Sequence, residues 1–102
     1  MSVIAMIKFD APAKAVEEMA GRDTDHMLER LAEIGRSKGA IHHQFLEAED
    51  GSVLAIDEWE SEQAFHDFFD HQADIGRLMA EAGVTRPPEA HFYRILPVND
   101  RF

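Results

Sequence analysis

The chain has 102 residues, of which 45% are hydrophobic and 29% are charged, and this composition predicts a single globular domain over residues 1–102. It carries 20 acidic and 10 basic side chains for a net charge of −10. A field of that sign repels phosphate backbones and anionic lipid, which argues against nucleic acid and membrane surfaces as partners. The lack of Cys rules out disulfides and thiolate chemistry. With no secretory leader or apolar run of about 18 residues, we expect a cytoplasmic protein.

The first 40 residues predict a strand, an irregular segment and a helix. Residues 3–7 form a continuous apolar run with β-branched members, which favours a strand covered on both faces. Residues 11–21 mix helix formers with proline and glycine, and we expect a loop with at most one helical turn. A helix is predicted from Asp23, with Asp23 or Thr24 as its N-cap and Gly39 as its stop.

The middle of the chain predicts a β-hairpin. Residues 41–48 and 52–59 have the composition of two strands. Between them, Asp50 and Gly51 are a strong signal for a two-residue turn. We therefore expect the two strands to pair directly with each other.

A second helix and a last strand complete the pattern. Ser61 is placed to cap a helix over residues 62–82, whose apolar face carries phenylalanines. We expect a break near residues 73–76 and a stop at Gly83. A final strand is predicted over residues 90–98.

The resulting order is β-α-β-β-α-β, which defines an α+β, ferredoxin-like fold. It predicts a four-stranded antiparallel sheet with both helices on one face. The other face of the sheet is then open, and an apolar open face must be buried by something. A partner chain is the expected cover.

The predicted turn also sets the register of the hairpin. It pairs His42 with Trp59 and Gln44 with Asp57, on the face that points away from the helices. The helix-facing core of the hairpin then consists of Ile41, Phe45, Leu54 and Ile56. The open face mixes polar and aromatic groups, so it is interpreted either as a dimer interface with polar pairs or as a partly polar cavity against a partner. A three-residue turn with a bulge would change this register.

The run from Glu58 to Phe65, a strand that ends in Trp and passes at once into an aromatic-rich helix, resembles the antibiotic biosynthesis monooxygenase family of the dimeric α+β barrel superfamily. The order of elements over nearly the whole chain resembles it as well. The resemblance implies a homodimer in which two sheets close into a barrel, with a ligand between the sheet and the second helix. Its members include cofactor-free oxygenases, haem-opening enzymes and isomerases.

The haem-opening branch of the family has an Asn on the first strand, a Trp within the second helix and a His about ten residues further on. This chain has no Asn on the first strand. Phe68 and Leu78 stand near the other two positions. We therefore do not expect haem degradation by that mechanism.

The resemblance to the cofactor-free branch implies a monooxygenase that acts on a small aromatic, polyphenol or quinone-like compound and needs no cofactor. His42 is the candidate base and Asp57 the group that orients it. The candidate substrate-binding residues are Trp59, Gln44, Tyr93 and Phe68. Two alternatives stay open, a non-enzymatic homodimeric module that binds a small ligand and an isomerase or decarboxylase on the same scaffold.

Six histidines raise the question of a metal site. His42 and His43 are neighbours on a strand, so they point to opposite faces. His66 and His71 diverge by about 140° on a helix. We therefore predict no metal site, and instead histidines that pair with nearby carboxylates, among them His43 opposite Glu58.

Overall fold

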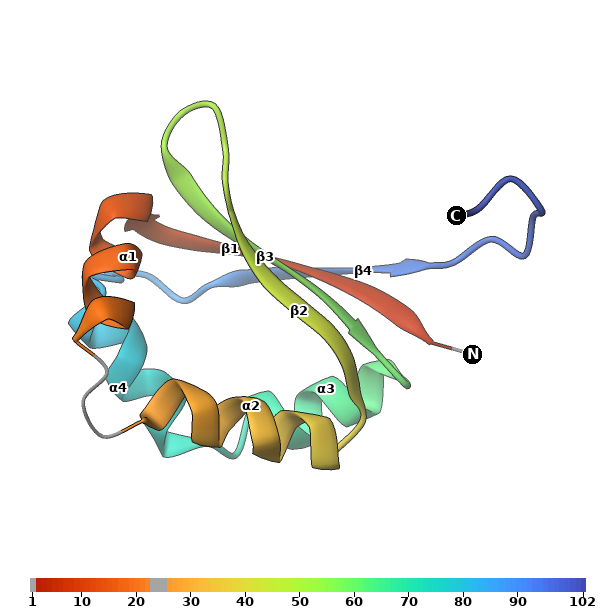
Figure 1. Ribbon diagram of the computed structural model, residues 1–102, viewed down its shortest axis with the longest axis horizontal. Helices are drawn as coiled ribbons and strands as arrows, with labels where there is room; N and C mark the ends of the chain where they lie inside the picture. The colour runs from red at the N-terminus through yellow and green to blue at the C-terminus, as the bar shows by residue number, and fades with distance from the viewer. Residues whose placement is uncertain (1, 23–25) are drawn as a thin grey trace.

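A computed structural model describes residues 2–22 and 26–102 of the chain. Its four strands form one antiparallel sheet in the order β2-β3-β1-β4, and the helices gather on one side of that sheet (Figure 1). The predicted ferredoxin-like fold is confirmed, with one helix more than expected before the first predicted helix and with the second predicted helix divided in two. The elements are β1 (Val3–Pro12), α1 (Ala13–Gly21), α2 (Met27–Ser37), β2 (Ala40–Glu47), β3 (Ser52–Trp59), α3 (Glu62–Phe69), α4 (Ala73–Glu81) and β4 (Glu89–Arg94).

The segment expected to be a loop is the helix α1, so that prediction was wrong. Pro12 has extended backbone angles and directly precedes the first helical residue. Met19 on this helix is buried, and Val16, one turn earlier, lines the same interior space. Burial of this apolar face stabilises a helix that the local composition alone does not establish.

The first long helix, α2, ends where the sequence predicts. Gly39 has a φ of 116°, a conformation that residues with a Cβ rarely adopt, and the preceding Lys38 amide closes the last turn on Ile34. The proposed capping residues Asp23 and Thr24 lie outside the described residues. The helix begins at Met27, after His26 in a left-handed conformation.

The junction after β3 is confirmed in detail. The Ser61 hydroxyl accepts a hydrogen bond from the Ala64 amide at 3.0 Å, which caps α3. The helical segment breaks at residues 70–72 and not at the predicted 73–76. Gly76 lies inside α4, and the predicted stop Gly83 follows it with a φ of 84°.

The predicted hairpin register was wrong by one residue. The Gly51 amide bonds to the Ala48 carbonyl, and the Ala48 amide bonds to the Ser52 carbonyl. Gly51 has a φ of 85°, so the loop is a tight turn followed by a left-handed glycine and not a two-residue turn. As a result Phe45 pairs with Ala55, where the sequence predicts Ile56.

The change of register reverses the faces of β3. Buried and half-buried residues alternate along this strand, and the buried positions Val53, Ala55, Asp57 and Trp59 face the helices. Leu54 and Ile56, predicted to lie in the helix-facing core, therefore point to the open face of the sheet.

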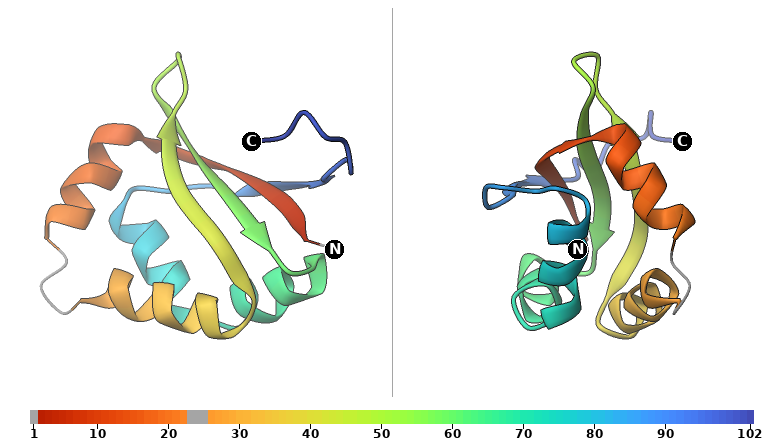
Figure 2. Two further views of the ribbon diagram at one scale, coloured as in Figure 1. Left: turned by 45° about the vertical axis from the view of Figure 1, so that its right-hand side comes forward. Right: turned by 90° about the vertical axis from the view of Figure 1, so that its left-hand side faces the viewer.

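The last strand ends at Arg94, earlier than the predicted residue 98. Arg94 pairs with Val3, the first residue of β1, so β4 has no strand beside it beyond that point. The remaining residues extend past the sheet toward the C-terminus (Figure 2).

Candidate functional site

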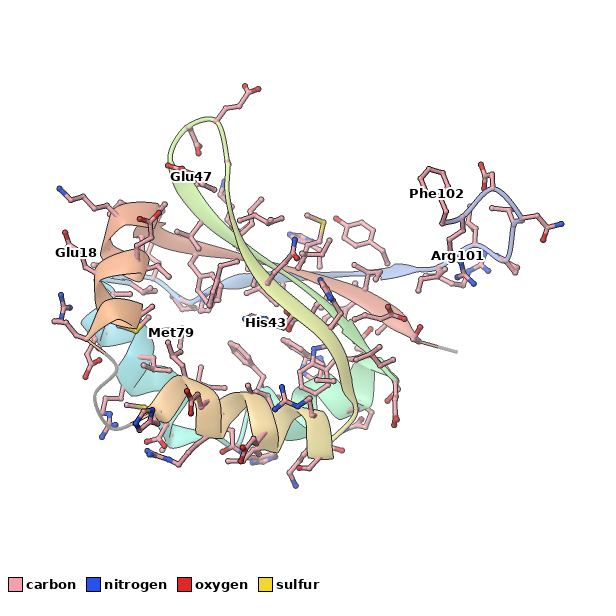
Figure 3. All side chains as sticks on the ribbon, in the orientation of Figure 1. Glu18, His43, Glu47, Met79, Arg101 and Phe102 are labelled. Atoms are coloured by element: carbon pink, nitrogen blue, oxygen red, sulfur yellow. The ribbon has the colours of Figure 1, made fainter. Side chains whose placement is uncertain are left out.

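An apolar cavity lies between the helix-facing side of the sheet and the helices. Its volume is about 330 Å³, within the size range of small-molecule pockets. Its walls are mostly aliphatic and aromatic, among them Ile7, Leu31, Val53, Ala55, Leu78 and Met79. Figure 3 shows His43 on the side of β2 that faces this space. The cavity can enclose an apolar compound and keep water away from it.

One carboxylate stands in this apolar wall. Asp57 is the one buried charged residue of the core among those the structure describes, at 6% exposure. The register explains its position, since Asp57 pairs with Ala5 on β1 and with His43 on β2. A buried carboxylate is costly unless it is paired and hydrogen-bonded, and both of its oxygens have partners here.

The two partners of Asp57 come from neighbouring positions of the sheet. His43 Nδ1 lies 2.6 Å from Oδ1 of Asp57. The Trp59 indole Nε1 donates to Oδ2 at 3.0 Å. We call this arrangement of His43, Asp57 and Trp59 the carboxylate triad.

The triad defines which nitrogen of His43 can act as a base. An ionised carboxylate only accepts hydrogen bonds, so the proton between the two groups sits on Nδ1. In the neutral ring, Nε2 then keeps a free lone pair. Within the part of the chain that the structure describes, no residue hydrogen-bonds to Nε2. The imidazole side chain is about half exposed, at 49%, so it is accessible to a ligand.

Aromatic packing fixes the third member of the triad. The Trp59 ring packs against Phe68 at a centroid distance of 5.4 Å and edge-on against Phe65 at 5.8 Å. Both phenylalanines are buried on α3. The capped helix therefore holds the indole, and the indole in turn holds one oxygen of Asp57.

The structure divides the six predicted site residues between the two faces of the sheet. Asp57, Trp59 and Phe68 all line the cavity. Gln44 lies on the open face. His42 pairs with Glu58 on the same face, and it also borders the cavity. Tyr93, paired with Ile4, shares this open face and is 50% exposed.

The sequence reading missed His43 as the partner of Asp57. It set His43 opposite Glu58, whereas His43 lies opposite Asp57. Glu58 instead accepts a hydrogen bond from the Ser2 hydroxyl at 2.6 Å. The sequence signal for the correct pair is Gly51. Placed as a left-handed residue after a tight turn, it shifts the register by one residue and sets His43 opposite Asp57.

The remaining histidines do not gather into a metal site. Within residues 2–22 and 26–102, no three His, Cys, Asp or Glu side chains are grouped so that they could hold a metal ion. His66 lies between carboxylates of its own helix, 3.3 Å from Asp70 and 3.6 Å from Glu62. This agrees with the prediction that helical histidines pair with nearby carboxylates.

None of the helices in the described residues has the length and apolar character needed to cross a membrane.

Comparison by sequence found no relative. No protein-family model matches the chain, and the search of curated proteins returned no match. Comparison by structure found close resemblance over nearly the full length of several solved proteins.

Three of these structures describe the range of neighbours. A monooxygenase from the gene ActVA-Orf6 of Streptomyces coelicolor, solved with the ligand Nanaomycin D, is 26% identical, with a TM-score of 0.64 over 95% of this chain and 93% of that one. A mutant of SnoaB, a cofactor-independent oxygenase from Streptomyces nogalater, is 17% identical, with a TM-score of 0.62 over 98% of each chain. A dimeric ferredoxin-like protein from an uncultured marine organism is 11% identical, with a TM-score of 0.65 over 99% of this chain and 93% of that one.

These likenesses confirm the resemblance drawn from the run after β3. They cover almost the whole chain, and they include a further structure described as an antibiotic biosynthesis monooxygenase. The chain therefore has the α+β fold shared by antibiotic biosynthesis monooxygenases and dimeric ferredoxin-like proteins.

Proposed function

We propose that the protein is a cofactor-independent monooxygenase that oxidises a small, flat, polyphenol or quinol-like compound in the cavity between sheet and helices. The observation that carries this proposal is the carboxylate triad in an otherwise apolar wall. A base held at one point of a largely apolar pocket suits a reaction that begins with proton removal from an apolar compound. The likeness to monooxygenases, one of them cofactor-independent, supports the same reaction class.

His43 is the proposed base. Asp57 accepts the Nδ1–H bond and so aims Nε2 at the substrate hydroxyl, and an imidazole exchanges protons readily near neutral pH. Trp59 holds the carboxylate and adds a flat apolar surface. This assignment replaces His42 by its neighbour on the strand and keeps Asp57, Trp59 and Phe68 in the proposed site.

The proposed chemistry is balanced by molecular oxygen alone. Proton transfer to His43 gives a substrate anion, which passes electrons to O₂ and forms a carbon–oxygen bond as a peroxide anion. His43 returns its proton to the peroxide oxygen and so completes the hydroperoxide. Loss of the remaining hydrogen from the oxidised carbon then breaks the O–O bond, leaves a carbonyl and releases the outer oxygen as water. One oxygen atom enters the product and the other leaves as water.

We also propose that the protein is a homodimer that pairs through the open face of the sheet. Ile4, Met6, Leu54 and Ile56 occupy the centre of this face by register, and none of the described helices covers it (Figure 2). A central apolar patch with polar residues around it is typical of an interface between protein chains. A second copy supplies the matching patch by symmetry.

The test of the enzymatic proposal is oxygen consumption with a panel of dihydroxynaphthalenes and anthrones. The wild type is compared with His43→Ala and with Gln44→Ala, a control on the opposite face of the same strand and outside the cavity wall. We expect His43→Ala to lower kcat by about 10²–10⁴-fold, the usual contribution of a general base. Gln44→Ala should leave kcat nearly unchanged.

Asp57→Asn separates the orientation of His43 from its presence. The amide presents an N–H where the carboxylate accepted a hydrogen bond, which favours the tautomer with the proton on Nε2. The base is then blocked while the ring stays in place. We expect a fall in kcat close to that of His43→Ala, with little change in the binding of substrate.

Two results would replace the proposal. Binding of the panel, followed through the fluorescence of the single Trp, without oxygen uptake would favour a ligand-binding module. Product formation under anaerobic conditions would favour an isomerase or a decarboxylase. Equal losses in Gln44→Ala and His43→Ala would remove His43 from the mechanism.

A further inference from the structure

The exposed residues of the cavity wall show where it opens. The solvent-exposed residues of the lining all belong to α2 or β2. They are Ala32, Arg36, Ile41, His42, His43 and Phe45. β2 is an edge strand, so no further strand closes the sheet there. The mouth of the cavity therefore lies between α2 and β2, which face the viewer in Figure 1.

Arg36 is the one Lys or Arg side chain in the described lining of this cavity. It stands in the last turn of α2, on the side of the mouth opposite His43. Across the described part of the chain, it has no hydrogen bond or ion pair. Its guanidinium is therefore available to a ligand at the mouth of the cavity.

From this placement we infer that Arg36 binds an anionic group of the ligand, so the site selects apolar ring compounds that carry a carboxylate or sulfonate beside the reacting hydroxyl. This inference deepens the proposed function and rests on the same cavity. A guanidinium binds planar anions through two parallel hydrogen bonds. Because Arg36 is exposed at the mouth, it is accessible to such a group while the ring enters the apolar cavity.

The charges of the site also orient such a ligand. The Asp57 carboxylate behind His43 repels an anion from that side of the mouth, and Arg36 attracts it to the other. The hydroxyl of the ligand is then left facing Nε2 of His43. The net charge of −10 disfavours anions over the rest of the surface, so a local cation is what permits an acidic ligand to enter.

The competing interpretation is that Arg36 only stabilises the C-terminal end of its helix. A cation in the last turn interacts favourably with the helix dipole. Lys38, at the C-cap of the same helix and outside the cavity wall, provides a matched control because it has the same charge and nearly the same position. A dipole effect changes stability in both variants and leaves ligand selectivity unchanged in both.

The experiment uses two fluorescent probes that differ in one charged group. 8-Anilinonaphthalene-1-sulfonate carries a sulfonate, and N-phenyl-1-naphthylamine is the same ring system without it. Each is titrated into the wild type, Arg36→Gln, Arg36→Lys and Lys38→Gln. We expect Arg36→Gln to weaken the sulfonate probe by about 10-fold or more, as for the loss of a charge-assisted hydrogen bond, and to leave the neutral probe unchanged.

The other arms complete the test. Arg36→Lys should retain part of the sulfonate binding, and Lys38→Gln should retain all of it. Equal binding of the sulfonate probe to wild type and Arg36→Gln, with the neutral probe still bound, would overturn the role of Arg36 and leave the proposed cavity in place. If neither probe binds the wild type, both the inference and the proposed ligand site are wrong.

Discussion

The two faces of this sheet differ in what covers them. On the helix-facing side the chain itself supplies the cover, and Asp57 and Trp59 are buried to 6% and 3% exposure. On the open side Leu54 and Ile56, which alternate with those residues along β3, are only half-buried. One face of β3 therefore lines a cavity that the helices cover, and its other face belongs to an apolar surface that none of the described helices covers.

This difference indicates why the chemistry is expected on one side only. A buried carboxylate with two hydrogen-bond partners needs rigid neighbours, and α3 provides them through Phe65 and Phe68. The open face has polar residues at its margin and aliphatic residues at its centre, which suits association with another chain. The variants below test each face separately.

The largest expected effect is that of Trp59→Ala. It removes a buried indole that packs on two phenylalanines and leaves a cavity, for a cost of about 3–5 kcal/mol in the free energy of unfolding. The measurement is urea unfolding followed by circular dichroism, because the variant has no Trp fluorescence. Trp59→Phe keeps a ring and should cost less. Equal costs for the two variants would show that ring packing is not what stabilises this side.

The second effect concerns the open face. Ile56→Asp places a charge at the centre of the proposed interface and should weaken the dimer by about 100-fold or more, which corresponds to about 2.7 kcal/mol. Light scattering over a concentration series measures the change. Lys8→Gln, at an exposed position of the same face, should leave the dimer intact. A wild type that stays at 11.6 kDa at micromolar concentration would contradict the pairing of open faces.

The parts of the fold that the sequence predicted are those with local signals. Ser61 caps α3 and Gly39 ends α2 through interactions within a few residues, so a reader of the sequence can find them. The helix α1 was missed because what favours it is its packing against β1 and β3 of the sheet, with Met19 buried. No local pattern records that contact.

The site depended on a single choice of turn. Asp57, Trp59 and Phe68 were singled out as candidates, and the structure brings them to one cavity. His43 was assigned a different partner because a two-residue turn and a turn with one further residue set opposite faces for β2 relative to β3. Both turns accept the dipeptide of Asp50 and Gly51, so composition alone did not decide between them.

A smaller effect tests the helix layer through its cap. Ser61→Ala removes the hydrogen bond to the Ala64 amide and should cost about 1 kcal/mol of stability. Ser37→Ala is the matched control, since the Ser37 hydroxyl bonds to a carbonyl one turn earlier in α2 and caps no free amide. Thermal unfolding of both variants gives the comparison. A cost for Ser37→Ala as large as that for Ser61→Ala would argue against capping as the cause.

The smallest effect lies at the end of β1, where an exposed contact ties the chain after α4 to the sheet. Oδ2 of Asp10 accepts hydrogen bonds from Arg86 Nε at 3.1 Å and from the Thr85 hydroxyl at 2.7 Å. The hydrogen bond from Arg86, followed by that from Thr85, lowers the pKa of Asp10 below its usual value of 3.8.

Because the pKa of Asp10 is lowered in the folded state, this contact stabilises the fold at pH values above the usual pKa. The stabilisation is lost as the pH falls through the pKa of the folded state. Asp10→Asn should therefore reduce the free energy of unfolding slightly at neutral pH, by less than Ser61→Ala, because exposed ion pairs contribute little. The wild type and the variant should converge in acid, and added salt should reduce their difference at neutral pH. Urea unfolding across this pH range is the measurement, with Arg86→Gln expected to lose the same pH-dependent contribution. A difference that grows as the pH falls would mean that Asp10 acts through some other contact.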